Sequence, residues 1–535
     1  MALTLESAVE TLAGHRLLRE IIQGDSWFLD PGRLPDARRP FTGVSYDSRT
    51  VTEGALYFCK GSFKPDYLVQ ADRAGMAAYV SETPMNECTG APGIIVNDVR
   101  KAMSLLAADF YGHPEDDLAL VGITGTKGKT TTAYYVQGIL NRSSGGRAAL
   151  LSSVDNCLDG KHYEESQLTT PESLDLFRMI RQAVDGGMRY LVMEVSSQAY
   201  KVDRVYGLTF DVGAFLNISP DHISPIEHPT FEDYLYCKRR IVQNCRRLVL
   251  GSACGHADLI REDAGMAGVP VTTFALSDRQ DGSPADGDFM AVPVDQADEA
   301  GGLPDTFLLY GRGKEIGRLT LSMDGDFNGL NAAAAMAIVS CLGLNPGSDD
   351  LTALSRIRVS GRMERFCADS LVVYVDYAHN QASVGALLDF VEGRYGERDP
   401  RVTLITGSAG GKAQDRRSGI ITAAQDRVDE IILTTDDPGD ESAEEICRQM
   451  AGFVTNREVE VRTVIDRTEA IRTAVDQAGS DGRFDVVLVI GKGEERWIKS
   501  QGRHLPYEGD DRVVARLLSD RSPATPPGEG SRVAR

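Results

Sequence analysis

An apolar run, a glycine-rich turn and a helical pattern follow one another between Leu118 and Leu140. The apolar residues 118–123 predict a buried strand, and the apolar positions after the turn recur at helical spacing. Such a turn, followed by a helix N-terminus, presents backbone N–H groups that hold phosphate. The Lys129 ammonium can reach β- and γ-phosphate oxygens, and the Thr130 hydroxyl suits Mg²⁺. The sequence therefore predicts an α/β domain with a nucleoside triphosphate site made of Gly125, Thr126, Lys127, Gly128, Lys129, Thr130 and Thr131.

The spacing of this turn departs from the strict phosphate-loop pattern G-x-x-x-x-G-K-[ST]. The first position of the pattern falls on Ile123, and Gly122 lies one residue earlier. A glycine-rich turn in another kind of α/β protein is the alternative. The strand before the turn and the Gly-Lys-Thr-Thr sequence within it favour phosphate binding.

The composition limits the possible classes of protein. With 535 residues, the chain is too long for one hydrophobic core and predicts about three domains. A net charge of −21 argues against non-specific nucleic-acid binding, so we expect no nucleic-acid partner. No window approaches the roughly 18 apolar residues of a membrane span, and no signal-peptide pattern begins the chain. The nine cysteines are scattered without a C-x-x-C pair, which indicates reduced thiols in a cytoplasmic protein.

Three domains and a tail are predicted along the chain. Residues 1–115 alternate short apolar runs with helical stretches, as in a small α/β domain. Residues 116–344 hold the phosphate loop, a mostly parallel sheet and a glycine- and aspartate-rich edge at roughly 280–326. In residues 345–520, four buried-looking strands each end in a polar loop, which predicts a doubly wound sheet with a site at the strand ends. Residues 521–535 look like a disordered tail.

Strand ends beside the phosphate loop carry candidate metal ligands. Glu194 ends the apolar run RYLVME, which is a usual place for a Mg²⁺ ligand. Asn217, Asp221 and His222 follow the next predicted strand. A solvent-facing carboxylate and ordinary loop residues are the alternatives. Lys238 lies in a basic helical stretch, and the residues alone leave it on a solvated face.

Three polar loops of the last domain should gather at one edge of its sheet. One loop carries Lys412, Arg416 and Arg417, a pattern that suits carboxylate or phosphate recognition unless it is only a basic surface loop. The others are DDPG at 436–439 and GKGEE at 491–495. Together they present cations and anions, which favours a small zwitterionic substrate such as an amino acid.

These segments together resemble the Mur ligases, most closely the MurE type. Those enzymes use ATP to add the third amino acid to UDP-N-acetylmuramoyl-L-alanyl-D-glutamate in peptidoglycan synthesis. The resemblance implies UDP-binding, ATP-binding and Rossmann-like C-terminal domains with the boundaries given above. It covers about residues 40–515 and rests on the combination of DSRTV (47–51), GTKGKTT (125–131), TTPE (169–172), MEVSSQ (193–198), NISPDH (217–222), YLYCK (234–238), GDFNGLN (325–331), SGRMERF (360–366), DYAHN (376–380), DDP (436–438) and GKG (491–493).

The resemblance also implies roles for individual residues. The UDP-muramoyl-dipeptide would be held by Ser48, Lys60, Thr169, Thr170, Ser196 and Arg204. ATP would contact, besides the phosphate loop, Asn328, Asn331, Arg362, Asp376 and His379. Two Mg²⁺ ions would be ligated with the help of Thr130, Glu194, His222 and Lys238, the last as a carbamate. The groups closest to the chemistry would be Lys129, Lys238 and His222, and the incoming amino acid would meet Arg417, Asp437, Pro438, Gly491 and Glu495.

The implied reaction has two steps, in which ATP phosphorylates the D-glutamyl γ-carboxylate and an amino acid's α-amine then displaces phosphate. Enzymes of this type that add meso-diaminopimelate carry D-N-P-R, whose arginine meets the distal carboxylate, whereas Gly439 stands here. We therefore expect L-lysine, with Glu495 or the acidic run from Asp436 receiving its distal ammonium. Ornithine and meso-diaminopimelate remain alternatives, because one methylene is worth only about 1–3 kcal/mol of discrimination. We expect a monomer.

Two other classes of function compete with this interpretation. A P-loop kinase or ATPase with another substrate would explain residues 118–140 but not TTPE, DYAH or the last domain. A non-catalytic binding protein that keeps a nucleotide fold would be favoured by the loss of Lys129, Glu194 or Lys238, and all three are present.

Overall fold

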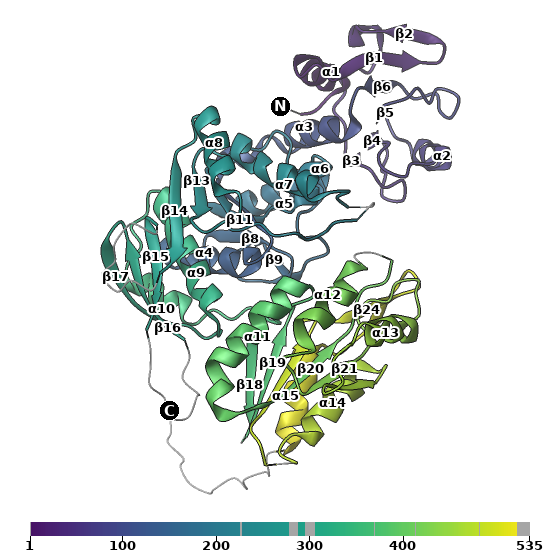
Figure 1. Ribbon diagram of the computed structural model, residues 1–535. Coiled ribbons are helices and arrows are strands. Elements are labelled where there is room, and N and C mark those ends of the chain that lie inside the picture. The colour runs from purple at the N-terminus through teal and green to yellow at the C-terminus, as the bar shows by residue number, and fades with distance from the viewer. Residues whose placement is uncertain are drawn as a thin grey trace, which may run out of the picture.

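The computed structural model describes residues 2–224, 227–277, 287–294, 305–368, 370–411, 414–480 and 482–521. The described chain forms three α/β domains, each built on a sheet of its own (Figure 1). The central domain lies between the other two along the molecule, and the predicted fold class is confirmed. Among the described helices, none combines the length and apolar character needed to cross a bilayer.

The N-terminal domain has a six-stranded sheet in the order β2-β1-β6-β5-β4-β3. Strands β3 to β6 pair in parallel, whereas β1 pairs antiparallel with β6 and β2. The first helix and the β1–β2 hairpin were not foreseen, although Leu5, Val9 and Leu12 are buried at helical spacing. The elements are α1 (Leu5–Gly14), β1 (Leu18–Gln23), β2 (Ser26–Phe28), β3 (Val44–Ser45), β4 (Leu56–Phe58), α2 (Pro65–Arg73), β5 (Ala78–Ser81), β6 (Gly93–Val96) and α3 (Val99–Tyr111).

The central domain has an eleven-stranded sheet in the order β10-β9-β8-β11-β7-β12-β13-β14-β15-β16-β17. The strands from β8 to β15 in this order are parallel, and both ends are antiparallel additions. Its strands are β7 (Ala119–Thr124), β8 (Ala148–Leu151), β9 (Asp155–Cys157), β10 (Glu164–Glu165), β11 (Tyr190–Glu194), β12 (Val212–Phe215), β13 (Leu248–Gly251), β14 (Val271–Leu276), β15 (Phe289–Pro293), β16 (Thr306–Gly311) and β17 (Lys314–Thr320). Its helices are α4 (Lys129–Ser144), α5 (Ser173–Asp185), α6 (Ser197–Lys201), α7 (Phe231–Arg239), α8 (Ala257–Ala267), α9 (Asp326–Cys341) and α10 (Ser348–Leu354).

The order of the central strands decides where the functional groups meet. β7 lies between β11 and β12 and is parallel to both. The loops after these three strands therefore leave the sheet at one edge, which brings the phosphate loop next to Glu194 and the loop that begins at Asn217. Helices α4 and α9 pack together on one face of the sheet, and α5 on the other face packs against α3 of the N-terminal domain.

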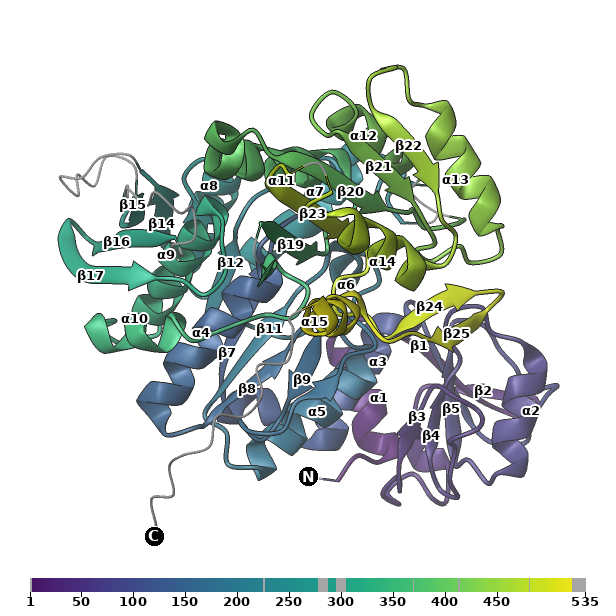
Figure 2. The same cartoon turned by 90° about the horizontal axis from the view of Figure 1, so that it is seen from below.

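The C-terminal domain has a six-stranded sheet in the order β18-β19-β23-β20-β21-β22, parallel except for β18. Helices α11 to α13 share one core with the sheet and α14 and α15 share another, as the doubly wound prediction required (Figure 2). The elements are β18 (Glu364–Ala368), β19 (Leu371–Asp376), α11 (Gln381–Tyr395), β20 (Arg401–Thr406), α12 (Asp415–Ala424), β21 (Glu430–Leu433), α13 (Ala443–Gly452), β22 (Glu460–Thr463), α14 (Arg467–Gln477), β23 (Asp485–Ile490), β24 (Trp497–Ser500), β25 (Arg503–Pro506) and α15 (Asp510–Arg521).

The boundary between the last two domains lies later than the expected position 344/345. Helix α10 packs against α4 and β17, and Leu351, Leu354 and Val359 are buried in a core of the central domain. The glycine-proline sequence before α10 is a turn inside the domain, which explains why it suggested a linker. Of the segments discussed above, residues 522–535 and Lys412 lie outside the described residues, as does part of the 280–326 edge.

Candidate functional site

The phosphate loop connects β7 to α4 and needs glycine at two positions. Gly128 has a φ of +83°, and a Cβ there would lie 2.5 Å from Asn331 Oδ1. Gly125 has a φ of +151°, and its Cβ would approach Leu216 Cβ to 3.0 Å. Asn217 fixes the loop from the neighbouring strand end, because its Oδ1 accepts from Lys127 N at 2.9 Å and its Nδ2 donates to Lys127 O at 3.0 Å. The loop is therefore a close-packed backbone cradle.

Lys129 and Thr130 begin helix α4 beside the carboxylate of Glu194. Lys129 Nζ donates to Gly125 O at 3.0 Å. Burial lowers the pKa of Lys129, an effect that Glu194 opposes and Arg362 strengthens. Thr130 Oγ1 lies 3.0 Å from Ser153 Oγ, which in turn donates to Glu194 Oε1 at 3.1 Å. These hydroxyl and carboxylate oxygens are the ligands that Mg²⁺ prefers, so the donor set fits the ion.

Lys238 is buried beneath the phosphate loop rather than on a solvated helical face. Only 2% of the residue is exposed, and its Nζ donates to Gly125 O at 2.8 Å. Burial and the nearby Lys129 ammonium lower the pKa of Lys238 well below its usual value. The ring of Tyr234 lies 4.9 Å from this nitrogen and 6.0 Å from the His222 ring. His222, at a φ of +57°, pairs its Nδ1 with Glu227 Oε2 at 3.2 Å.

A cavity of about 220 Å³ lies between the central and C-terminal domains next to the phosphate loop. This cavity is lined by four of the five residues that were expected to contact ATP besides the phosphate loop, namely Asn328, Asn331, Arg362 and Asp376. Both carboxylate oxygens of Asp376 accept backbone N–H bonds, from Met363 and Ala378 at 2.8 Å each. His379 does not line this cavity, so its contact with ATP stays a prediction.

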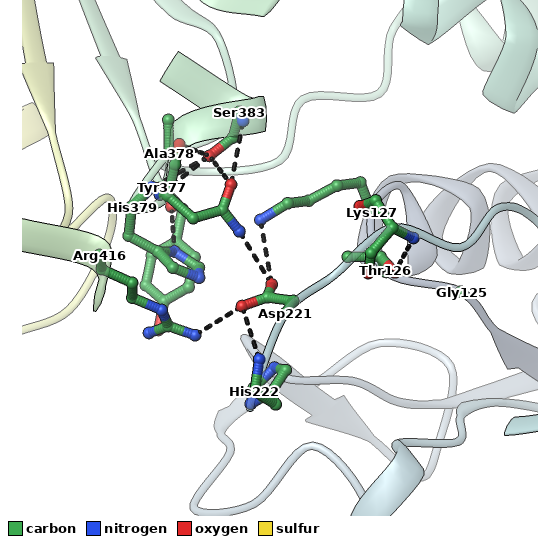
Figure 3. Close-up of polar contacts among 12 residues, drawn as sticks. Gly125, Thr126, Lys127, Asp221, His222, Tyr377, Ala378, His379, Ser383 and Arg416 are labelled. Atoms are coloured by element: carbon green, nitrogen blue, oxygen red, sulfur yellow. Dashed lines mark hydrogen bonds and ion pairs between the residues drawn. The ribbon is translucent and has the colours of Figure 1, made fainter. Parts of the chain in front are cut away.

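Asp221 joins the central domain to the C-terminal domain (Figure 3). Its carboxylate accepts from Arg416 Nη2 and Asn380 Nδ2, both at 2.9 Å, and lies 3.7 Å from Lys127 Nζ. Figure 3 also shows His379 beside the Asp221 carboxylate. Burial and the Lys127 ammonium lower the pKa of His379 well below its usual value. Asp221 was grouped with possible metal ligands from the sequence, and the structure gives it partners on the opposite domain instead.

A larger cavity of about 650 Å³ connects the predicted binding groups. From the central domain it is lined by Lys129, Thr169, Ser196, Arg204, His222 and Lys238, and from the C-terminal domain by Arg362, Tyr377, Glu494 and Glu495. Residues assigned to phosphate, to the muramoyl dipeptide and to the amino acid thus face one space. Thr170 is fully buried beside it, and its hydroxyl donates to Glu194 O at 3.0 Å.

Glu172 connects this cavity to the N-terminal domain. Its carboxylate accepts from Lys60 Nζ at 2.7 Å and from Arg204 Nη2 at 2.7 Å. Lys60 also lies 4.2 Å from the ring centre of Tyr46. Ser48 is buried in the N-terminal domain and donates to Gln70 Oε1 at 2.9 Å. The predicted UDP residues and the predicted dipeptide channel are therefore joined by an ion-pair bridge that sequence alone did not indicate.

The acceptor loops of the C-terminal domain carry an internal cation. Lys492 is fully buried and pairs with Asp437 at 2.7 Å and with Glu495. Burial would lower the pKa of Lys492, but Asp436, Glu495 and Asp437 outweigh it and raise the pKa. At Gly491 a Cβ would lie 2.5 Å from Asp436 Oδ2, so the two loops touch. Asp437 and Glu495, which were expected to receive the distal ammonium of the substrate, are thus already paired with the ammonium of Lys492.

Arg417 and the acidic run after Gly439 differ from expectation. Arg417 is buried and pairs with Glu441 at 3.0 Å, so it lines neither cavity and supports the loop from within. Glu445 pairs with Arg448 at 2.6 Å and Glu444 accepts from Ser442 at the start of α13. Glu444 and Glu445 are used locally because they lie in the first turn of α13, whose N-cap residue is Ser442 and whose helix dipole favours negative charge there. Pro438 precedes Gly439, whose N–H donates to Lys499 O at 3.0 Å.

Sequence reasoning missed a chain of hydrogen bonds at the wall of the larger cavity. Ser197 Oγ lies 2.9 Å from His228 Nε2, and His228 Nδ1 lies 2.6 Å from Asp233 Oδ2. Lys201 donates to the same Asp233 oxygen at 2.6 Å, so a second cation there is disfavoured, although His228, Asp233 and Cys237 have the spacing of metal ligands. The only available indication was that Ser197 follows Ser196 in MEVSSQ.

A phosphate loop that faces a doubly wound domain across a cavity lined with cations and carboxylates defines an enzyme that couples a nucleotide to a second substrate. The chain matches the Mur ligase middle domain over residues 123–339 and the Mur ligase, glutamate ligase domain over residues 361–493. It is also 56% identical to the UDP-N-acetylmuramyl-tripeptide synthetase of Bifidobacterium longum, over 97% of this chain and 100% of that protein. The chain belongs to the Mur ligase family, and it is a ligase.

Other relatives agree with this placement. The UDP-N-acetylmuramoyl-L-alanyl-D-glutamate–L-lysine ligase of Enterococcus faecalis is 41% identical over 98% of this chain and 100% of its own length. The fold is similar to that of a solved UDP-N-acetylmuramoyl-L-alanyl-D-glutamate–2,6-diaminopimelate ligase, with a TM-score of 0.62 at 22% identity, over 98% and 100% of the two chains. MurF from Thermotoga maritima, solved with ADP, gives a TM-score of 0.58 at 16% identity, over 90% of this chain and 99% of that one.

Proposed function

We propose that this ligase joins L-lysine to the D-glutamyl γ-carboxylate of UDP-N-acetylmuramoyl-L-alanyl-D-glutamate and converts ATP to ADP and phosphate. The observation that carries the proposal is the single cavity of about 650 Å³, which is lined by Lys129, Arg204 and Glu495. These are the groups expected at the transferred phosphate, at the dipeptide and at the amino acid. The names of the Bifidobacterium and Enterococcus relatives support the same substrates.

The first step is transfer of the γ-phosphoryl group to the D-glutamyl carboxylate. The backbone N–H groups of the phosphate loop hold the phosphates, and Lys129 offsets the charge that develops on the transferring group. Asn328, Asn331 and Arg362 line the smaller cavity, which is suited to the rest of the nucleotide. Thr130, Glu194, His222 and carbamylated Lys238 would hold Mg²⁺, expected as two ions, which supplies electrophilic assistance to the phosphate oxygens.

The burial of Lys238 supports its carbamylation. CO₂ reacts with a neutral amine, and a pKa well below the usual value favours the neutral form of this amine. The resulting carbamate is an anion beside the Lys129 cation, which stabilises the product of the modification. An unmodified lysine at this place would add a second positive charge, or an unused amine, under the phosphate loop.

The second step is attack of the amino acid's α-amine on the acyl phosphate. A tetrahedral intermediate forms at the carbonyl carbon and expels phosphate. Asp221, Arg416 and Asn380 hold the C-terminal domain against the phosphate loop, and this contact limits the access of water, which would hydrolyse the acyl phosphate.

The acceptor loop supports L-lysine over meso-diaminopimelate. The second acceptor carries an extra carboxylate at its distal end, and burying that anion without a partner is costly. Gly439 contributes no side chain, and Arg417 is already paired with Glu441. Glu495 and Asp437 would bind the distal ammonium of the acceptor together with Lys492. This arrangement favours the single positive charge of lysine over the zwitterionic distal end of meso-diaminopimelate. Ornithine remains the closest alternative.

We further propose that the enzyme acts in the cytoplasm as a monomer and binds no nucleic acid. The net charge of −21 supports the absence of a nucleic-acid partner. All nine cysteines are unpaired, which supports a reducing compartment.

A panel of acceptors tests the proposed function. Purified protein is given ATP, Mg²⁺, the UDP-linked dipeptide and one of L-lysine, ornithine, meso-diaminopimelate or alanine, and the tripeptide product is measured by mass spectrometry. We expect the highest kcat/KM with L-lysine. ATP consumption without a tripeptide product would instead indicate a kinase or ATPase. Lys129→Ala should abolish product without unfolding the protein, whereas Lys314→Ala, at an exposed position in β17, serves as the matched control.

A further inference from the structure

Five carboxyl groups line the larger cavity within the described residues, and one of them has a buried oxygen atom without a hydrogen-bond partner. Asp155 accepts from Tyr134 Oη at 2.9 Å, and Glu227 lies 3.2 Å from His222 Nδ1. Glu495 is paired with Lys492 and Glu165 is exposed. Glu494 Oε2 is buried and makes no hydrogen bond in the described part of the chain. A buried, unpaired carboxyl oxygen is costly and therefore points to a function.

The surroundings of Glu494 place it where the two substrates meet. Its charge interacts with that of Arg362, and Arg362 lines both the nucleotide cavity and the larger cavity. The guanidinium of Arg362 lies 4.5 Å from the ring centre of Tyr377, whose Oη donates to Glu495 Oε1 at 3.4 Å. Glu494 therefore stands between the nucleotide side of the cavity and the carboxylate expected to face the amino acid.

The charged groups around Glu494 have opposing effects on its ionisation. Burial is the largest and raises the pKa of Glu494 to about 7, with Glu495 and Asp155 adding to the increase. Arg362 acts in the opposite direction. Arg496, two residues after Glu494 along the chain, is engaged with Asp511 at 2.7 Å. A carboxyl group in this range exchanges protons at neutral pH, as a general base must.

The proposed ligation needs a base that the groups assigned so far do not supply. At neutral pH the α-amine of a free amino acid is mostly an ammonium ion, which has no lone pair with which to attack. Burial raises the pKa of Glu495, but this carboxylate is already engaged in an ion pair with the buried Lys492 ammonium, which opposes uptake of a proton.

We propose that Glu494 is the general base that deprotonates the α-ammonium of the incoming amino acid. This inference rests on the proposed ligase function. The ammonium N–H bond breaks and its proton passes to the Glu494 carboxylate, leaving the electron pair on nitrogen. The neutral amine then forms the bond to the acyl carbon, and the C–O bond to phosphate breaks. The second proton of the amine leaves with the expelled phosphate, so protons and charge balance.

A nucleophile that needs no deprotonation separates this role from a structural one. Hydroxylamine is uncharged at neutral pH and traps the acyl phosphate as a hydroxamate. In Glu494→Gln we expect lysine-dependent tripeptide formation to fall about 10²–10³-fold, while hydroxamate formation stays at the wild-type level. Glu494→Asp, which keeps a carboxyl group, should retain part of the activity with lysine. Glu508→Gln, an exposed carboxylate paired with Arg516, is the matched control and should change neither rate.

The pH dependence gives a second readout. Protonation of Glu494 removes the base, so the wild-type rate with lysine should fall as the pH drops below about 7, and this decline should be absent in Glu494→Gln. Equal losses with lysine and hydroxylamine, or no loss with lysine, would overturn the assignment. Failure of the wild-type protein to form any hydroxamate from ATP and the UDP-linked dipeptide would instead contradict the proposed ligase function.

Discussion

Replacing Asp221 by asparagine should weaken the contact between the central and C-terminal domains. The substitution keeps the size of the side chain and removes its negative charge. Arg416 and Asn380 then face a neutral amide, which can accept through one oxygen only. Lys127, at 3.7 Å, also loses its counter-ion. The three partners come from two domains, so the loss bears on the closed arrangement more than on the folding of either domain.

The magnitude follows from the two interdomain hydrogen bonds, both of 2.9 Å. Hydrogen bonds to a charged group contribute about 1.5–3 kcal/mol each, and one of the two can be partly kept by the amide oxygen. A loss of about 3 kcal/mol shifts the equilibrium between closed and open domains by roughly 10²-fold, since about 1.4 kcal/mol corresponds to a factor of ten. The unfolding temperature should change much less, because each domain keeps its own core.

The assay compares kcat/KM, ADP affinity and small-angle scattering of Asp221→Asn with those of the wild type. Asp415→Asn, an exposed acid next to Arg416 in α12, is the control. We expect a lower kcat/KM and a larger radius of gyration only for Asp221→Asn. An unchanged kcat/KM together with unchanged scattering would refute the reasoning.

The pH dependence of this effect has a definite sign. Burial alone would raise the pKa of Asp221, but Lys127, His222 and Arg416 outweigh it and hold the pKa well below its usual range. A carboxyl group with a lowered pKa contributes its stabilisation above the unfolded-state pKa of about 4 and loses it as the pH falls through the folded-state value. The difference in interdomain stability between the wild type and Asp221→Asn should therefore be constant between about pH 5 and 7. Above this window the difference should decrease, because burial lowers the pKa of Lys127 to about 8 and its ammonium loses its charge. A difference that declines between about pH 7 and 5 would contradict the assignment of Asp221 as a charged link.

Three further substitutions probe other parts of the molecule. Lys238→Ala should lower ligase activity by roughly 10²-fold, and acetate or formate should restore part of it by replacing the carbamate, whereas wild-type activity without rescue would contradict carbamylation. Gly439→Arg has room, because the nearest atom to its Cβ would be Gly410 O at 3.6 Å, although a side chain at the φ of +61° lowers the stability of the fold by about 1–2 kcal/mol. Competition kinetics of this variant should show a lower ratio of kcat/KM for lysine to kcat/KM for meso-diaminopimelate. Asp510→Asn leaves the fully buried Arg467 guanidinium without its anion, so calorimetry should show a loss of about 3–5 kcal/mol in the C-terminal domain.

The sequence could predict the elements whose structure depends on near neighbours. The strand that ends at Glu194 was expected from the apolar run RYLVME, and the structure gives it as Tyr190–Glu194. The phosphate loop was predictable because its glycines, lysine and threonine lie within seven consecutive residues between a strand and a helix. The convergence of Glu194 and His222 on this loop also followed from the sequence, since parallel strands place their following loops at one edge.

The pairing of side chains across domains could not be predicted in the same way. Asp221 meets Arg416 across 195 residues, and Lys60 meets Glu172 across 112 residues. No local pattern shows which of many acids such a cation contacts. The same limit explains Arg417, which lies next to Arg416 but turns into its own domain to pair with Glu441.

The sequence by itself determined the class of the protein, its three α/β domains and the nucleotide loop, because short-range periodicity, turn residues and motifs of consecutive residues fix these features. The tertiary structure alone decided that Lys238 is buried, that Lys492 pairs with two acceptor carboxylates and that one oxygen of Glu494 is buried without a hydrogen bond. Burial and charge pairing depend on how distant segments pack, and the ionisation of a side chain depends on that packing rather than on its neighbours in the chain.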